Sequence, residues 1–174
     1  INAFNACNNL KNVTLGKNKS NSSMNIAREA FSKCVSLQNL TLGSEVNEIG
    51  KEAFISCTSL QSLTIPGTVS SIGESAFKNC ISLAELIIGD DDMSHGTIIY
   101  KNAFIGCSGL RNTTLNKSVI LNTLNEDHYY SRTSEFIFED ATGNIHINCE
   151  ITDHKDNSKG YTFRISPEYS YNKS

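Results

Sequence analysis

The residues of this chain that could carry out acid–base chemistry are four histidines. His154 lies between Asp153 and Asp156, which is the composition of a local acid–base cluster. The run that contains them, D-H-K-D-N-S-K-G, also has the composition of a solvated turn, and we favour the turn because turns collect polar residues and glycine. The sequence has no G-x-S-x-G, no H-E-x-x-H and no glycine-rich phosphate loop, so we predict no catalytic residues and no enzyme. The other histidines fall in expected loops or at polar strand positions: His95, His128 and His146.

Three consecutive aspartates, Asp90, Asp91 and Asp92, could supply carboxylate oxygens to a hard cation such as calcium. Consecutive side chains rarely point at one ion unless the loop curls around it, and the Asp-x-Asp-x-Asp-Gly spacing of a calcium loop is missing. We therefore predict a solvated acidic loop. The sequence predicts no metal ligands and no cofactor.

Five of the six cysteines recur at one position of a repeated segment, which bears on both metal binding and disulfides. No Cys-x-x-Cys is present, and thiolates spread along a stack cannot converge tetrahedrally on zinc. Neighbouring cysteines of a stack would be close enough for a bridge, but their side chains would point the same way. We predict a reduced, buried ladder, with disulfides as the alternative. The five are Cys7, Cys34, Cys57, Cys80 and Cys107, and Cys149 lies on the apolar side of a strand pattern.

The segment that positions these cysteines is an Ala-Phe pair, a Cys three residues later, a Leu three further on, and two more apolar positions. Its phenylalanines are separated by steps of 27, 23, 23 and 27 residues. Such a period indicates stacked units that can bury their apolar faces only against one another. They are Phe4, Phe31, Phe54, Phe77 and Phe104.

One copy shows how the unit should fold. Leu63-Thr64-Ile65 alternates as a half-buried strand, Pro66-Gly67 turns the chain, and Val69 and Ile72 point inward. Gly73 permits a tight corner before a short helical turn through Ala76-Phe77. We predict a leucine-rich-repeat solenoid of the α/β class with about five coils of 23–27 residues. Its parallel β-sheet should lie on the concave face, with short helical turns opposite.

The expected domain organisation has three parts: the solenoid at residues 1–121, a polar connection at 122–134, and a β-rich region at 135–174. Strand patterns at 135–139, 145–151 and 161–165 predict either a β-meander that caps the solenoid or the start of a further all-β region. Two additions of four residues follow the first and fourth strands and should bulge at one edge. Because residue 1 falls inside a repeat, we expect a fragment of a longer protein.

Outward positions of the expected strands form two rows that give the candidate binding face. Repeated Asn and Thr in parallel register can support the stack by hydrogen bonding along the ladder. They can equally form a flat, weakly charged interaction surface of the kind that solenoids use for binding. The candidates are Asn12, Asn39, Ser62, Glu85 and Asn112 in one row, Thr14, Thr41, Thr64, Ile87 and Thr114 in the other, and Arg111 beside them.

The overall charge and the hydropathy pattern limit the classes of partner. The net charge of −3 and the pI near 5.8 leave no basic footprint for nucleic acid. No apolar run approaches the roughly 20 residues that span a bilayer, so we expect no membrane insertion.

The pattern L-x-x-L-x-I-P-x-x-V-x-x-I-G-x-x-A-F-x-x-C-x-S of the third copy resembles the BspA-type leucine-rich repeat, and the resemblance extends over residues 1 to about 121. It implies a curved solenoid found mostly in bacterial and protozoan surface or secreted proteins, without a catalytic motif or a fixed binding signature. The departures are Gly43, Gly89 and Asn116 for the strand-ending Pro, Ala27 and Tyr100 for the corner Gly, and Thr113 for an inward Leu.

The function implied by this resemblance is a non-enzymatic, extracellular or cell-surface recognition module. It would mediate adhesion to host matrix proteins, host cells or other microbes, with protein as the expected partner and carbohydrate as an alternative. Two other interpretations stay open: a scaffold or accessory domain that positions another part of a longer polypeptide, and an intracellular protein–protein adaptor.

Overall fold

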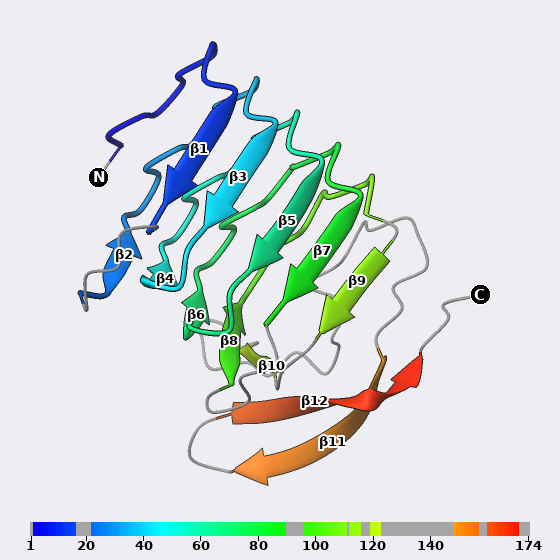
Figure 1. Cartoon of the computed structure of the whole chain (residues 1–174). Coiled ribbons are helices and arrows are strands. Elements are labelled where there is room, and N and C mark those ends of the chain that lie inside the picture. Colours follow the sequence, from blue (N-terminus) through cyan, green and yellow to red (C-terminus); the bar gives the residue numbers. More distant parts are fainter. Residues whose placement is uncertain are drawn as a thin grey trace.

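The chain winds into a parallel β-solenoid in which each coil contributes one strand to each of two faces (Figure 1). The computed structural model describes residues 2–16, 22–89, 96–110, 112–115, 119–122, 148–156 and 160–170. The front face is formed by β1 (Asn12–Leu15), β3 (Asn39–Leu42), β5 (Ser62–Ile65), β7 (Glu85–Ile88) and β9 (Asn112–Leu115). The back face is formed by β2 (Met24–Ile26), β4 (Val46–Ile49), β6 (Ser71–Ile72), β8 (Thr97–Tyr100) and β10 (Val119–Asn122). The predicted leucine-rich-repeat solenoid is confirmed, and the described residues supply five strands to each face.

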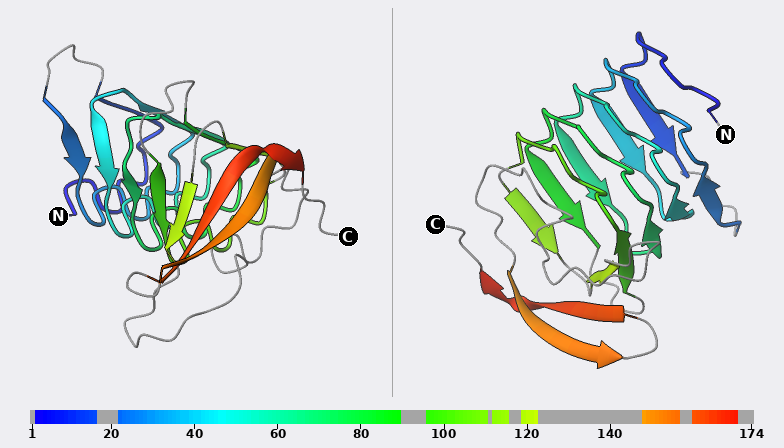
Figure 2. Two further views of the ribbon diagram at one scale, coloured as in Figure 1. Left: turned by 90° about the horizontal axis from the view of Figure 1, so that it is seen from below. Right: turned by 180° about the vertical axis from the view of Figure 1, so that it is seen from behind.

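The back face is a second parallel sheet, whose strands pair in the order β10-β8-β6-β4-β2. Figure 2 shows the stack from below and from behind, with the coils following one another as similar loops. The sequence predicted the inward positions Val69 and Ile72, which are both fully buried, but it did not predict this sheet. Its strands are only two to four residues long, so period-two alternation has little room to show.

The front face is divided between the second and third coils. β1 pairs with β3, and β5 pairs with β7 and β9, but no ladder joins β3 to β5. At the ends of neighbouring strands, Gly43 N donates to Leu15 O at 2.7 Å and Gly89 N donates to Ile65 O at 2.9 Å. The equivalent residue of the third coil is Pro66, which has no N–H to donate. The strand-ending proline therefore accounts for part of this seam.

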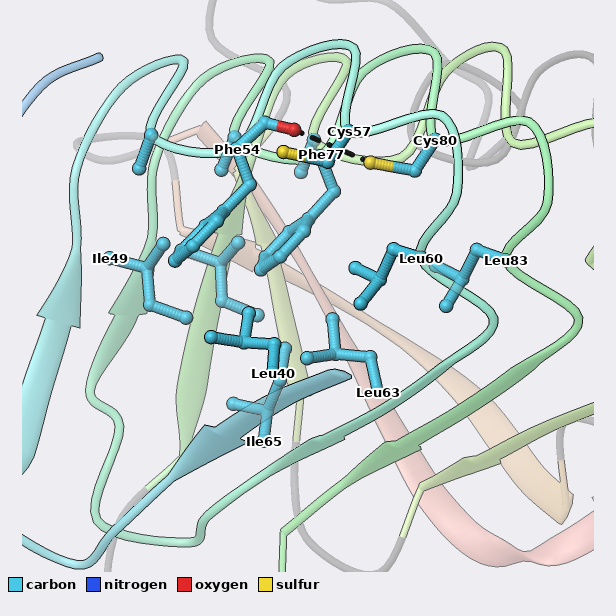
Figure 3. Close-up of a cluster of buried hydrophobic side chains, with 14 of the residues drawn as sticks. Leu40, Ile49, Phe54, Cys57, Leu60, Leu63, Ile65, Phe77, Cys80 and Leu83 are labelled. Atoms are coloured by element: carbon cyan, nitrogen blue, oxygen red, sulfur yellow. Dashed lines mark hydrogen bonds between the residues drawn. The ribbon is translucent and has the colours of Figure 1, made fainter. Parts of the chain in front are cut away.

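A column of phenylalanine rings holds the coils in register. Successive centroids from Phe4 to Phe104 are 5.0, 5.2, 5.2 and 5.4 Å apart, and the rings lie within 7° of parallel. Figure 3 shows the parallel rings of Phe54 and Phe77 side by side along the stack, with Leu60 and Leu83 next to them. The rings of the third to fifth coils are fully buried, whereas Phe4 at the N-terminal end is 48% exposed. The core is thus a stack of equivalent layers.

The Ala-Phe segments form tight turns, and the described residues contain no helix, so the expected helical turns are wrong in this detail. Ala53 N donates within its coil to Gly50 O, whereas Phe54 N donates to Ala76 O of the next coil at 2.8 Å. An α-helix would direct all of these N–H groups along its own axis. Left-handed residues also break a helix, and Ser56 at φ 60° is one of them.

Gly73 forms the expected corner, for a reason other than a left-handed backbone. A Cβ at this position would lie 2.5 Å from Lys51 N and 2.9 Å from Ile49 O of the preceding coil. Only glycine lets the two backbones approach this closely. Close contact between coils therefore requires glycine at this corner.

Two long strands, β11 (Asn148–Asp156) and β12 (Gly160–Ser170), follow the solenoid. β12 pairs antiparallel with β10 at the end of the back sheet, and β11 pairs antiparallel with β12. They overlap two of the three expected strands, while 135–139 lies outside the described residues, as do most of both loop additions. β11 continues through Asp156, so the turn expected from Asp153 onwards is wrong for the D-H-K-D portion.

Candidate interaction surface

The front face presents a row of amide and hydroxyl groups to solvent over the first three coils. Strand alternation buries Leu40 and Leu63 and turns the intervening polar side chains outward. We name these six residues the amide–hydroxyl surface, and all are exposed: Asn12, Thr14, Asn39, Thr41, Ser62 and Thr64.

The register of the strands places like residues side by side. Asn12 pairs with Asn39, and Thr14 pairs with Thr41. The Asn39 side chain donates from Nδ2 to Asn12 Oδ1 at 2.7 Å, so the predicted amide ladder does form between these two coils. This bond uses one donor and one acceptor of the pair, and it leaves the other amide hydrogens and lone pairs for a ligand or for water.

The remaining candidates lie at the C-terminal end of the front face. Glu85 is exposed and pairs with Ser62, and Ile87 is half-buried beside Thr64. Asn112 and Thr114 lie in β9 in register with them, although the described part does not extend to their side chains. Arg111 lies outside the described residues.

Two exposed glutamines at the edge of the front face were missed by the sequence reasoning. Gln38 and Gln61 immediately precede β3 and β5 and extend the amide character of the face. The signal was present in the segments L37-Q-N-L40 and L60-Q-S-L63, where the same amide repeats before the strand. Together with the residues above they make the surface around β3 and β5 polar and uncharged, whereas the equivalent position before β1 is the exposed Lys11.

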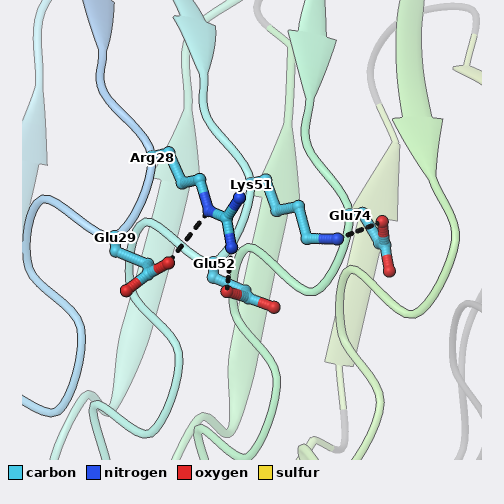
Figure 4. A network of polar contacts seen from close by, with 5 residues as sticks. All are labelled: Arg28, Glu29, Lys51, Glu52 and Glu74. Carbon is cyan, nitrogen blue, oxygen red and sulfur yellow. Dashed lines mark hydrogen bonds and ion pairs between the residues drawn. The ribbon is translucent and has the colours of Figure 1, made fainter. Parts of the chain in front are cut away.

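Five charged side chains lie at the corners that follow β2, β4 and β6 (Figure 4), whereas exposed Lys11 precedes β1 at the edge of the front face. Arg28 Nε is 2.9 Å from Glu29 Oε1, and its Nη2 is 3.7 Å from Glu52 Oε2. Lys51 Nζ donates to Glu74 Oε2 at 2.7 Å, and this hydrogen bond raises the pKa of Lys51. These pairs are partly solvated, so each contributes about 0–1 kcal/mol to stability. We call these five residues the charged corner.

The cysteines of the second to fifth coils are buried free thiols, as the reduced-ladder interpretation predicts. Burial raises the pKa of Cys57 to about 12 and also raises the pKa values of Cys34 and Cys80. A thiol held protonated is a poor nucleophile and a poor metal ligand. Within the part of the chain that the structure describes, no three His, Cys, Asp or Glu side chains are grouped to hold a metal ion. Among those same residues, no helix is long and apolar enough to cross a membrane.

Comparison with known proteins places this architecture in a family. The model of the BspA type leucine rich repeat region matches six copies in the chain, over residues 1–111 and 24–163. A search of curated proteins found no match.

Two solved structures are similar to the chain. One is a leucine-rich repeat protein from Bacteroides ovatus, with 36% identity and a TM-score of 0.56 over 64% of this chain and 27% of that one. The other is a leucine rich cell surface protein from Faecalibacterium prausnitzii, with 26% identity and a TM-score of 0.48 over 77% of this chain and 40% of that one. The chain thus spans well under half the length of either protein.

The matched residues cover more than half of the chain and include the stacked phenylalanines and the paired strands of the solenoid. On these grounds the chain belongs to the BspA-type leucine-rich repeat family.

Proposed function

We propose that this chain is a non-enzymatic recognition module that acts at a cell surface or after secretion, where it mediates adhesion to host matrix proteins, host cells or other microbes. Family membership supports a surface repeat module, because solenoids of stacked repeats use their extended faces for interaction. The adhesion partner and the extracellular location are expectations from the resemblance.

The observation that carries the proposal is the exposure of the amide–hydroxyl surface. Packing uses the Ala, Phe, Cys and Leu of every coil, and these side chains are buried in the third and fourth coils. The outward side chains of β1, β3 and β5 are not needed for the core, so they are free to differ between proteins of the same fold. We therefore place the binding face on the front sheet, continuing to Glu85 and Ile87 and, by register, to Asn112 and Thr114. Arg111 stays in the proposal as the residue that precedes Asn112 in the sequence.

The same proposal assigns residues 1–121 to the recognition solenoid, residues 122–134 to the connection and residues 135–174 to its C-terminal cap. The antiparallel pairing of β12 with β10 supports a cap, because it adds a strand to the end of the back sheet.

The test is binding of the full chain to immobilised matrix proteins and to cells. Saturable binding should fall on Thr41→Lys or Glu85→Lys, which alter exposed front-sheet positions without touching the core. Ser71→Lys is the matched control, since Ser71 is an outward position of the back sheet. A folded chain that binds none of these targets, or a loss of binding with Ser71→Lys alone, would contradict the proposal.

A further inference from the structure

We propose that the amide–hydroxyl surface binds an extended, neutral, 1,4-linked polysaccharide that runs across the strands along the stack. The inference rests on the proposed function, because it takes the front sheet as the binding face and names the class of ligand. Three features of the described residues lead to it: neutrality, hydrogen-bonding chemistry and spacing.

Neutrality is a property of the six residues themselves, with exposed Lys11 beside them at the edge of the first coil. The charged corner collects Arg28, Glu29, Lys51, Glu52 and Glu74, whereas the six residues of the amide–hydroxyl surface carry no charge. Protein partners are commonly selected through complementary charge, which also speeds their association. An uncharged face cannot select a partner by complementary charge. It suits a neutral ligand, because no charged side chain has to lose its hydration water without gaining an opposite charge in return.

The chemistry of the surface matches hydroxyl groups. A Thr or Ser hydroxyl both donates and accepts, and an Asn amide has two donors and an acceptor. Sugar hydroxyls have the same dual character, so either partner can supply the hydrogen. The Asn39–Asn12 bond of 2.7 Å holds two of the amides in a fixed orientation, which lowers the entropy lost when a ligand binds.

Spacing favours a sugar chain over a peptide. The coils repeat every 5.0–5.4 Å at the Phe column in the core, and the paired strands of the front sheet lie about 4.8 Å apart. This is close to the advance of one ring in an extended 1,4-linked pyranose chain, so each ring would meet one Asn or Ser and one Thr. A peptide strand advances about 3.4 Å per residue and would lose step with the coils. Peptides also add to a sheet at its edge rather than across its face.

The affinity of one such surface should be low. Tight protein interfaces depend on Trp, Tyr and Arg anchors, and none of the six residues is of these types. A ligand that repeats can engage many surfaces at once, which converts weak contacts into firm attachment.

Affinity electrophoresis and calorimetry of the full chain test the proposal with matched polymers. Hydroxyethylcellulose and glucomannan are the neutral probes, and carboxymethylcellulose presents a similar backbone with negative charges. We expect both neutral polymers to retard the chain, and carboxymethylcellulose to do so less. The double variant Thr41→Val and Thr64→Val removes two hydroxyls at constant shape and should weaken binding about tenfold. Ser71→Val on the back sheet should leave binding unchanged.

Failure of this inference can be separated from failure of the proposed function by a cell assay. If cells are bound through the front sheet but neither neutral polymer binds, and periodate oxidation of cell-surface glycans leaves binding intact, the ligand is protein and the inference is wrong. The inference is also wrong if the double variant binds the polymers as well as the unmodified chain. If the front-sheet variants bind cells normally, the placement of the recognition face fails as well.

Discussion

The thiol of Cys57 donates a hydrogen bond to the main-chain carbonyl of Phe31 in the preceding coil, with Sγ and O 3.3 Å apart. That carbonyl already accepts the N–H of Cys34 within its own coil at 3.3 Å, so the thiol occupies its second lone pair. Equivalent thiol bonds of 3.1–3.4 Å recur at the other junctions, from Cys34, Cys80 and Cys107. The repeated cysteine therefore connects one coil to the next.

Replacing this thiol should destabilise the fold. Cys57→Ala leaves a small cavity and removes a donor from a buried carbonyl, and we expect a loss of about 1–3 kcal/mol in the free energy of unfolding. Cys7→Ala is the control, because Cys7 is only half-buried. Urea denaturation of both variants measures the difference. If both variants lose the same free energy of unfolding, the hydrogen bond from Cys57 to Phe31 does not contribute to stability.

Alkaline pH should weaken the protein through the same residue. The pKa of Cys57 is raised from 9.0 to about 12, so the folded state favours the neutral thiol. Its contribution is fully present below pH 9.0, and is lost as the pH rises towards about 12. By pH 11 the unmodified chain should have lost about 3 kcal/mol more than Cys57→Ala relative to neutral pH. Urea titrations of the two proteins across this range measure the difference, and identical pH profiles would contradict the assignment.

Replacement of two buried threonines by valine should change the stability of the protein in opposite directions. Thr113 is 1% exposed, and its Oγ1 has no hydrogen-bond partner among the described residues, whereas Thr97 Oγ1 donates to Val69 O at 2.8 Å. Thr113→Val should stabilise the chain by about 1 kcal/mol, because it removes an unpaired hydroxyl. Thr97→Val should destabilise it by about 1 kcal/mol. Thermal unfolding gives both signs, and a destabilised Thr113→Val would indicate a partner for this hydroxyl.

The phenylalanines of the column should contribute unequally to the free energy of unfolding, depending on their position in the stack. Phe54 is fully buried between Phe31 and Phe77, and Phe54→Ala should cost about 3–5 kcal/mol. Phe4 stacks on Phe31 alone and is 48% exposed, so Phe4→Ala should cost about 1 kcal/mol. Chemical denaturation separates the two variants. Similar costs would mean that the N-terminal coil is as tightly packed as the third.

The coil period and the inward–outward assignment could be predicted from the sequence because they depend on repeated side-chain types. Leu63 is buried and Thr64 is exposed, as their alternation requires. The turn conformation could not be predicted in the same way. Glu52 and Ser56 adopt φ values of 57° and 60°, and neither residue type signals a left-handed backbone. Their conformation follows from hydrogen bonds between coils, which a single copy of the repeat does not reveal.

The candidate surface was foreseen more completely than its surroundings. The Asn39–Asn12 ladder follows from parallel register and a repeated amide. The charged corner was not predicted. Arg28, Lys51 and Glu74 occupy the same position in three successive repeats, but the charge at this position changes sign, so no repeated motif appears in the sequence. Only stacking shows that opposite charges become neighbours, as Lys51 and Glu74 do.

The thiol-to-carbonyl junction has a consequence for how such proteins change in length. The donors that link the coils find their acceptors at equivalent positions of adjacent coils, as Cys80 does with Phe54 and Phe54 N does with Ala76. Duplicating one 23-residue unit in the gene would therefore recreate both junctions on either side of the new unit. Recombination between copies can therefore add or remove whole coils while the hydrogen bonds between coils are kept. The number of exposed front strands, and with it the size of the binding face, can change in evolution while the fold stays the same.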